Sequence, residues 1–412
     1  MEVRPGYKQT EVGVIPESWE LRRLGELATI ATGNTPPTSD ASNYGDEFLF
    51  VGPVDISDAK FISKTEKQLS KKGFAMSRRF PKGSILFVSI GSTIGKCGIA
   101  PVELTSNQQI NAILPSPSFS IDYLYYAVYA AAPRIRAQAG EQAVPIVNKS
   151  QFSDTAIAVP PLPEQRAIAT ALSDVDALLN GLERLIAKKS DLKQAAMQQL
   201  LTGQTRLPGF HGEWEVKRLG DLAAMGSGGT PTSSVPAYYD GDIPWVSISD
   251  MTKGGKVITG TERNLTRAGF ANCAAQMFPI ETVLYAMYAS LGECSIAGIS
   301  LCSSQAILGI RPRDCLSNEF LYYYLTSLKP IVKSLGQQGT QSNLNKGMVQ
   351  DFRFRLPPLP EQTAIAAVLS DMDAELAALE ARRDKTQALK QAMMQELLTG
   401  KTRLISTGDN HA

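Results

Sequence analysis

Two long stretches of the chain, residues 160–207 and 357–404, place apolar residues at alternating spacings of three and four. The first series is Ile168, Leu172, Val175, Leu179, Leu182, Ile186, Ala196 and Leu200, and the second is Ile365, Leu369, Met372, Leu376, Leu379, Met393 and Leu397. A sustained period of 3.5 residues predicts a long coiled-coil helix in each stretch. Since each apolar stripe needs a partner, we expect the two helices to pack on each other. The alternative is separate helices, each lying on its own domain.

Polar residues interrupt both apolar series. They are Lys189 and Lys193 in the first stretch, and Arg383, Thr386 and Lys390 in the second. Such interruptions can fix the register or orientation of paired helices. They are equally compatible with exposure where the helices diverge.

Both stretches open on PPLPEQ, at residues 160–165 and 357–362. A proline at the first helical position costs no hydrogen bond, so Pro163 and Pro360 predict helix starts. Glu164 and Glu361 then lie in the first turn, where the helix dipole favours a carboxylate. Gly203 and Gly400 are placed as C-terminal caps. PPLPEQ is therefore interpreted as a signal for helix entry.

The remaining sequence has the pattern of mixed α/β structure. Short β-like runs at 84–90, 282–288 and 305–311 alternate with turns rich in Gly, Pro, Ser and Asn. Residues 121–138 and 318–335 predict helices that carry aromatic stripes. We interpret these stripes as core packing in preference to a platform for stacking bases.

The chain is a tandem duplication. Residues 160–207 and 357–404 are identical at 31 of 48 positions without a gap. Weaker matches upstream pair WELRRLGELA (19–28) with WEVKRLGDLA (214–223), GNTP (33–36) with GGTP (228–231), IGKC (94–97) with LGEC (291–294) and DYLYY (122–126) with EFLYY (319–323). One half of each copy has stayed nearly constant while the other has diverged. The repeat divides the chain into domains 1–158 and 208–355, spacer helices 159–207 and 356–404, and an expected disordered tail, 405–412.

Composition narrows the class of protein. The charged fraction of 20% and the hydrophobic fraction of 43% are typical of a globular protein, and no apolar run reaches 18 residues. The start of the sequence lacks the apolar segment of a signal peptide, and the five cysteines form no CxxC pair. We therefore expect reduced thiols and a cytoplasmic location. With only two histidines, a histidine base or metal site is disfavoured.

Charge is concentrated locally although the net charge is only +1. Residues 60–82 hold eight basic side chains against one acidic residue, Glu66, a density that suits contacts to phosphates. The second copy carries a thinner parallel series, and polar loops recur in register in both copies. Asn, Gln, Ser and Thr in such loops can pair with base edges, although they are also ordinary turn residues. The alternative for the basic stretch is a merely solvated face.

We therefore take a set of basic and loop residues as candidates for DNA binding. In the first copy they are Asn34, Thr35, Lys60, Lys64, Lys67, Lys71, Lys72, Arg78, Arg79, Lys82, Ser92, Thr93, Lys96, Asn107 and Gln108. In the second they are Thr230, Lys253, Lys256, Arg263, Arg267, Ser290, Ser304, Gln305, Gln338, Thr340, Gln341 and Asn343.

No catalytic motif survives inspection. GSTIGKC (91–97) is one residue too short for a phosphate-binding loop and lacks the following Ser or Thr, and the second copy has Glu293 in place of Lys96. GSGGTP (226–231) lacks the third glycine of a dinucleotide fingerprint. Signatures of zinc proteases, serine hydrolases, EF-hands and amino-methyltransferases are missing from the sequence. We expect no catalytic residue and no metal site.

The opening YKQTEVGVIPESWELRRLGEL, the second start HGEWEVKRLGDL and the two PPLPEQ helices ending in LLTG together resemble the DNA specificity (S) subunit of type I restriction–modification systems. The resemblance covers essentially the full length. It implies two α/β (α+β) target-recognition domains, each reading half of a bipartite double-stranded DNA site, joined by two antiparallel coiled-coil helices that set the half-site spacing. It also implies two adenine-methylating modification subunits and restriction subunits as partners. S-adenosylmethionine, ATP and Mg would then belong to those partners, and none to this chain.

Three other interpretations stay open at this stage. The chain could serve a different restriction class with the same modular plan, or be a divergent DNA-modifying enzyme in its own right. It could also be a scaffold whose PPLPEQ segments recruit proline-binding domains. The helix-start signals beside both PPLPEQ copies disfavour the scaffold.

Overall fold

The computed structural model describes residues 4–140, 144–338 and 343–405. Its chain divides into two compact units. Unit 1 comprises Met1–Leu182 and Arg382–Ala412, and unit 2 comprises Glu183–Ala381. Each unit therefore takes the start of one long helix and the end of the other. These units group residues that contact one another, whereas the ranges 1–158, 159–207, 208–355 and 356–404 follow the sequence repeat.

The two long helices are α5 (Leu162–Thr202) and α11 (Leu359–Leu397). At 1.5 Å per residue, the 41 residues of α5 correspond to a helix of about 60 Å. Gly203 and Gly400, with φ of +73° and +69°, follow the helices in the left-handed conformation of a C-terminal cap. Pro163 and Pro360 lie in the first turn, one residue later than predicted.

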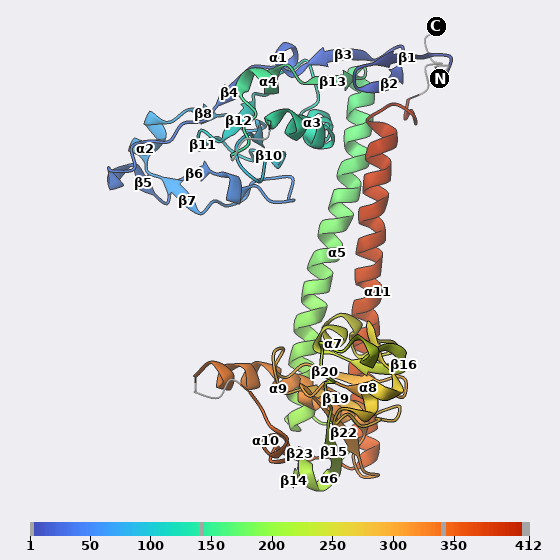
Figure 1. Ribbon diagram of the computed structural model, residues 1–412. Helices are drawn as coiled ribbons and strands as arrows, with labels where there is room; N and C mark the ends of the chain where they lie inside the picture. The colour runs from blue at the N-terminus through green and yellow to red at the C-terminus, as the bar shows by residue number, and fades with distance from the viewer. Residues whose placement is uncertain (1–3, 141–143, 339–342, 406–412) are drawn as a thin grey trace. The chain divides into compact units, whose positions relative to one another are not determined.

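Unit 1 holds two sheets and two short strand pairs (Figure 1). A four-stranded sheet has the order β10-β9-β12-β4, and a five-stranded sheet has the order β5-β7-β6-β11-β8. The strands are β1 (Tyr7–Thr10), β2 (Gly13–Pro16), β3 (Glu20–Arg23), β4 (Ile30–Thr32), β5 (Tyr44–Gly45), β6 (Phe48–Val51), β7 (Lys67–Leu69), β8 (Arg79–Phe80), β9 (Ile85–Val88), β10 (Cys97–Ile99), β11 (Leu104–Ser106), β12 (Ile110–Ile113) and β13 (Ala156–Val159). The shorter helices are α1 (Leu24–Leu27), α2 (Lys71–Met76), α3 (Ile121–Arg136) and α4 (Lys149–Ser153), with 3-10 turns at Ala41–Asn43, Pro53–Asp55 and Ala137–Ala139.

Unit 2 repeats this plan with fewer strands. Its five-stranded sheet has the order β15-β22-β19-β20-β17, and its three-stranded sheet has the order β18-β16-β21. The strands are β14 (Glu215–Arg218), β15 (Ala223–Ser227), β16 (Tyr239–Val246), β17 (Val257–Ile258), β18 (Arg263–Leu265), β19 (Val283–Ala286), β20 (Cys294–Ala297), β21 (Cys302–Ser303), β22 (Ile307–Pro312) and β23 (Arg353–Leu356). The shorter helices are α6 (Leu219–Leu222), α7 (Ile248–Gly254), α8 (Arg267–Ala271), α9 (Asn318–Gln338) and α10 (Lys346–Gln350), with a 3-10 turn at Pro236–Tyr238.

The core of each unit includes side chains of both long helices. In unit 1, Leu172 of α5 and Leu397 of α11 join the cluster formed around α3 and β9. In unit 2, Leu200 of α5 and Leu369 of α11 join the cluster around α9 and β19. Burying a leucine side chain contributes about 1.5–3 kcal/mol. The helices are therefore part of each folded unit as well as partners of each other.

The helices run antiparallel within each unit, beside one another (Figure 1). In unit 2, Lys189 pairs with Glu375 at 2.7 Å, and Lys193 pairs with Asp373. In unit 1, Lys390 pairs with Asp176 at 2.6 Å. The start of α5 also forms an ion pair with the segment that follows α11. All the predicted apolar seam positions are buried or half-buried, and so are the five polar interruptions. The interruptions thus lie inside the helix pair, and three of them make ion pairs across it.

The predicted α/β (α+β) fold class is confirmed, in two tandem copies. The runs at 84–90, 282–288 and 305–311 form β9, β19 and β22, and the two aromatic stripes lie in α3 and α9. Tyr123, Tyr125 and Tyr126 in α3 and Phe320 and Tyr323 in α9 are at most 2% exposed. These aromatic residues are core, as the sequence indicates. Within the described part of the chain, no helix is long and apolar enough to cross a membrane.

Candidate nucleic-acid interface

The PPLPEQ glutamate is a buried carboxylate that joins three segments of a unit. In unit 1, Glu164 accepts hydrogen bonds from the indole nitrogen of Trp19 at 3.0 Å and from Arg403 Nη2 at 2.8 Å. Arg403 lies in the TRL segment after α11, and its guanidinium contacts both carboxylate oxygens. The Glu164 side chain is only 2% exposed. We call this arrangement the clasp of unit 1.

Unit 2 has the same clasp, built from the other halves of the repeat. Glu361 accepts from the indole nitrogen of Trp214 at 3.0 Å and from Arg206 at 2.5 and 2.6 Å. Arg206 belongs to the TRL segment after α5. The end of one copy therefore closes on the start of the other copy in both units. The paired N–H donors of arginine match the two oxygens of a carboxylate, which makes this a strong, oriented contact.

The next residue of PPLPEQ, a glutamine, is also buried and forms hydrogen bonds with backbone groups. Gln165 accepts from Ser120 N and donates to Pro160 O, at 2.8 and 2.9 Å. Gln362 accepts from Ser317 N and donates to Pro357 O, each at 2.8 Å. These bonds fix the start of each long helix to the loop before α3 or α9. The hexapeptide is thus a structural junction, as its interpretation as a helix-entry signal anticipates.

Lys60, a DNA-binding candidate, instead ties the diverged part of unit 1 to α5. Its ammonium lies 2.6 Å from Asp122, donates to Ser173 at 2.9 Å and sits 4.8 Å from the centre of the Tyr126 ring. Tyr126 in turn donates to Asp176, which also pairs with Lys390. With its side chain 11% exposed, Lys60 is committed to this network.

Lys256 does the same in unit 2. It donates to Glu319 at 2.7 Å and to Ser370 at 2.8 Å, and lies 4.8 Å from the centre of the Tyr323 ring. Tyr323 donates to Asp373 at 2.6 Å, just as Tyr126 donates to Asp176. We call these two arrangements the anchor networks. They give Lys60 and Lys256 a positioning role, and DNA contact by either side chain stays a prediction.

The polar loops of unit 1 meet in one cluster beyond the ends of β4 and β11. Thr35 donates to Gln108 Oε1 at 2.6 Å, and Asn34 Oδ1 accepts from Arg78 N at 2.6 Å. The guanidinium of Arg78 donates to the carbonyl oxygen of Thr32. A Cβ on Gly33 would lie 2.3 Å from the backbone oxygen of Asn107, so only glycine allows the two loops to approach. We call this cluster the polar frame.

Unit 2 contains an equivalent polar frame. Gln305 N donates to Thr230 Oγ1 at 3.4 Å, and Gln276 Nε2 donates to Ser227 O at 3.2 Å. A Cβ on Gly228 would lie 2.2 Å from the backbone oxygen of Ser304. Gln305 and Thr230 are exposed, whereas Ser304 is buried. Sequence inspection missed Gln276, although it stands two residues before Phe278-Pro279 just as Arg78 stands two residues before Phe80-Pro81.

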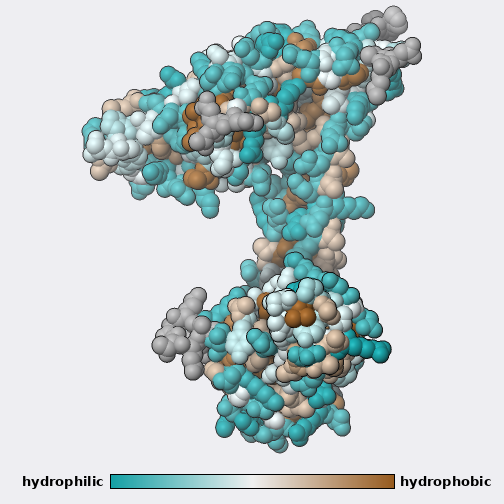
Figure 2. Space-filling model, in the orientation of Figure 1, coloured by the Kyte–Doolittle hydropathy of each residue, from teal (hydrophilic) through white to brown (hydrophobic). Residues whose placement is uncertain are grey.

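The remaining basic candidates of unit 1 divide into paired and unpaired side chains. Lys72 pairs with Asp40 at 2.7 Å and holds the pKa of that carboxyl well below its usual range, at about 2. Lys71 lies 3.9 Å from Glu47, and the Arg79 guanidinium lies over the Phe74 ring. Lys64, Lys67 and Lys82 are exposed, and among the described residues they have no ion pair. Figure 2 shows the surface over β5, β7 and α2 as mostly hydrophilic to neutral.

Fewer cations of unit 2 are available. Lys253 pairs with Glu262 at 2.5 Å, and the Arg263 guanidinium lies 4.2 Å from the centre of the Tyr239 ring. Arg267 is exposed at the start of α8, Asn343 is exposed, and Ser290 is half-buried. The Gln338 side chain, Thr340 and Gln341 lie outside the described residues. DNA contact by any of these side chains stays a prediction.

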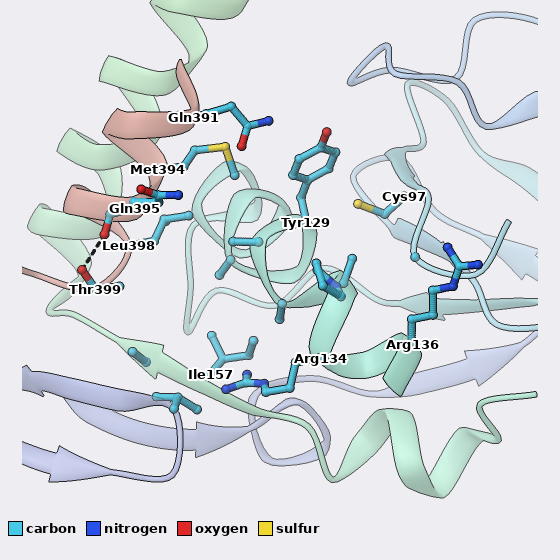
Figure 3. A pocket seen from close by; sticks show the side chains of 18 of the residues that line it. Cys97, Tyr129, Arg134, Arg136, Ile157, Gln391, Met394, Gln395, Leu398 and Thr399 are labelled. Carbon is cyan, nitrogen blue, oxygen red and sulfur yellow. Dashed lines mark hydrogen bonds between the residues drawn. The ribbon is translucent and has the colours of Figure 1, made fainter. Parts of the chain in front are cut away.

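The loop that carries Ser92, Thr93 and Lys96 connects β9 and β10. Lys96 lines a cavity of about 800 Å³ between the loop, α3 and the end of α11. Figure 3 shows Gln391 and Met394 of α11, with Leu398 just after that helix, on one side of the cavity and Cys97 and Arg136 on the other. Burial raises the pKa of the Cys97 thiol to about 12, so the thiol stays protonated at neutral pH. All five cysteines are free.

Apart from Lys60 and Lys256, the clasp and anchor residues were not among the sequence candidates, although the sequence held a signal for them. Trp19, Glu164 and Arg403 each have an identical counterpart at the matching position of the other copy. That recurrence marks a shared task but does not say which residues meet. Over the same described residues, no group of three His, Cys, Asp or Glu side chains could hold a metal ion.

The fold and the repeated frames define a two-module recognition protein. The model of the family described as "Type I restriction modification DNA specificity domain" matches residues 16–193 and again residues 211–390. The chain belongs to this family.

Relatives and solved structures agree with this membership. A putative type I restriction enzyme MjaX specificity subunit from Methanocaldococcus jannaschii is 26% identical, and the match covers 97% of each chain. A type I restriction enzyme HindI specificity subunit from Haemophilus influenzae is 31% identical over 28% of this chain and 25% of its own.

Two solved structures share the fold. A chain from a structure on complex assembly and conformational transition of the type I R-M system has a TM-score of 0.62 at 22% identity, over 94% of this chain and 99% of its own. The S subunit from M. genitalium has a TM-score of 0.60 at 16% identity, over 96% and 98%.

Proposed function

We propose that this chain is the DNA sequence-specificity subunit of a type I restriction–modification complex, in which each unit reads one half of a bipartite site. The observation that carries the proposal is the two-fold occurrence of the family's DNA specificity domain in one chain. The clasp and anchor network are the same in both units, whereas the polar frames differ. Common anchors with different frames suit the reading of two different half-sites.

Double-stranded DNA and the other subunits of the complex are its partners. The chain recognises DNA, and catalysis belongs to those subunits. We assign S-adenosylmethionine to two modification subunits, and ATP and Mg to restriction subunits. Since α5 and α11 are single uninterrupted helices, we assign them the setting of the half-site spacing.

The near-constant helices offer equivalent surfaces to two identical modification subunits. Leu192 and Leu389 occupy matching positions of the repeat and are 48% and 54% exposed. An exposed leucine on each long helix, at the same place in the repeat, supports docking of one modification subunit per copy. The two anchor networks place each recognition module on its helix in the same way, which supports the same arrangement.

Mapping of methylated adenines tests this function. The chain is co-expressed with its modification subunit in a host without other adenine methylation, and methylated positions are read genome-wide. We expect one bipartite sequence with a fixed spacer, and a longer spacer when one heptad is inserted into each of α5 and α11. Methylation by the purified chain alone, or a single undivided site, would contradict the proposal.

A further inference from the structure

Arg78 of unit 1 and Gln276 of unit 2 occupy the same place in their polar frames. The side chain of Arg78 donates to the carbonyl oxygen of Thr32, the last residue of β4. The side chain of Gln276 donates to the carbonyl oxygen of Ser227, the last residue of β15, at 3.2 Å. Thr32 and Ser227 immediately precede the matching sequences GNTP and GGTP. One backbone carbonyl therefore orients a different functional group in each unit.

The surroundings of this position are partly shared. Both frames keep a buried glycine, at Gly33 and Gly228, and a threonine two residues later. The threonine contacts the loop after β11 or β21 in both units, through Gln108 or Gln305. The frame is thus the same scaffold in both copies.

The residue before the shared threonine also differs between the two units. Asn34 in unit 1 contacts the segment before β8 with its side chain, through Met76 O and Arg78 N. Unit 2 has Gly229 at that place, where a Cβ would lie 2.3 Å from Ala275 N. In unit 2 the backbone itself closes the gap that the Asn34 side chain closes in unit 1. The divergence of the two copies is therefore concentrated in the side chains that the frame presents.

The two side chains offer different hydrogen-bonding groups. A guanidinium has five N–H donors and no acceptor, and Arg78 is exposed with one nitrogen engaged by Thr32. Donors in a rigid fork match the N7 and O6 acceptors of guanine. The amide of Gln276 keeps an N–H donor and its oxygen acceptor, the combination that matches N7 and N6 of adenine. Prior orientation by a backbone carbonyl lowers the entropy lost on contact with a base.

We propose that Arg78 and Gln276 are specificity-determining residues at equivalent positions, Arg78 selecting a guanine in the half-site of unit 1 and Gln276 selecting an adenine in that of unit 2. This inference rests on the proposed function. It assigns sequence reading to the polar frame and leaves the exposed lysines as contacts to phosphates, which carry no sequence information.

Exchange of the two side chains tests the inference. Arg78→Gln and Gln276→Arg are each co-expressed with the modification subunit, and methylated adenines are mapped as above. We expect Arg78→Gln to lower the preference for guanine at one position of one half-site by roughly 10- to 100-fold. The other half-site stays unchanged and serves as the internal control. Gln276→Arg should change one position of the opposite half-site, away from adenine.

Arg79→Gln is the matched control, since it removes the same charge from the adjacent residue outside the frame. It should weaken methylation uniformly and alter neither half-site. Arg78→Lys keeps the charge without the fork, and should also lose guanine preference if Arg78→Gln proves unstable. If both half-sites stay unchanged in Arg78→Gln and Arg78→Lys, Arg78 is a phosphate contact or a brace and the inference is wrong. If the unmodified chain yields no bipartite methylation at all, it is the proposed function that fails.

Discussion

The two units differ least where they hold the long helices and most in the side chains of their polar frames. Tyr126, Ser173 and Asp176 in unit 1 have identical counterparts in Tyr323, Ser370 and Asp373, with the same contacts. The polar frames keep their backbone contacts but exchange Arg78 for Gln276 and Asn34 for Gly229. A duplicated protein can thus preserve how a module is mounted while changing what the module reads.

The loop between β9 and β10 in unit 1 differs in another way from the loop between β19 and β20 in unit 2. Lys96 in unit 1 lines an open cavity, whereas its counterpart Glu293 in unit 2 is paired with Lys329. Position 132, matching Lys329, is an alanine in unit 1. A small side chain there leaves space that the ion pair occupies in unit 2. The loop therefore borders a cavity in unit 1 and holds an ion pair in unit 2.

Loss of the clasp carboxylate should lower the free energy of unfolding more than the other changes, and by the same amount in both units. Glu164→Ala and Glu361→Ala each leave a largely buried arginine and an indole N–H without their acceptor. Breaking such a buried pair costs about 3–5 kcal/mol of unfolding free energy. Urea unfolding followed by tryptophan fluorescence measures it, since Trp19 and Trp214 sit in the two clasps. Glu213→Ala, at an exposed residue beside Trp214, should change stability by less than about 0.5 kcal/mol.

A difference of more than about 2 kcal/mol between the two clasp variants would show that the clasps are not equivalent.

Replacing the lysines inside the helix pair should lower the free energy of unfolding by less, and by unequal amounts. Lys390 and Asp176 are 12% and 16% exposed, whereas Lys193 and Asp373 are 22% and 30% exposed. Because screening by water weakens exposed pairs, Lys390→Met should cost about 1–3 kcal/mol and Lys193→Met about 1 kcal/mol or less. The same unfolding measurement applies. The double variant Asp176→Asn with Lys390→Met should recover part of the loss, and the reverse ranking of the two lysines would contradict the argument.

Substitution of single surface cations should have the smallest effect, which is a change in the salt dependence of DNA binding. This change should be larger for cations of unit 1 than for cations of unit 2. Lys64→Ala and Lys67→Ala remove exposed charges that have no ion pair within the described structure, so each should lower the slope of log K against log salt by about 1. Lys253→Ala removes a charge already paired with Glu262 and should change the slope less. Titration of DNA binding at several salt concentrations measures the slope. Equal slopes for all three variants and the unmodified chain would identify a solvated face instead.

Much of the architecture was predictable because it depends on local periodicity. The 3.5-residue apolar repeat is a property of neighbouring turns of one helix, so it gave α5, α11 and their buried seam before any contact was known. The β-like runs and the aromatic helices followed from local pattern in the same way. Identical segments also revealed two copies, since internal similarity needs no structure to be seen.

Basic composition was a weaker guide to the interface. Lys60 and Lys64 look alike in the sequence, yet Lys60 is held by Asp122 and Ser173 while Lys64 is exposed. Which acidic and hydroxyl groups surround a lysine depends on segments more than 60 residues away, as the separation of Lys60 from Ser173 shows. Charge counted along the chain therefore overstates the charge available to DNA.

The sequence by itself determined the duplication, the two helices and the division of each copy into constant and diverged parts, because these are written in residue identity and spacing. Only the tertiary structure decided that the copies interlock, with Arg403 closing on Glu164 and Arg206 on Glu361. It alone showed that the side chains of Arg78 and Gln276 donate to equivalent backbone carbonyls. The physical reason is that hydrogen bonds and ion pairs act over about 3 Å in space, whatever the distance along the chain.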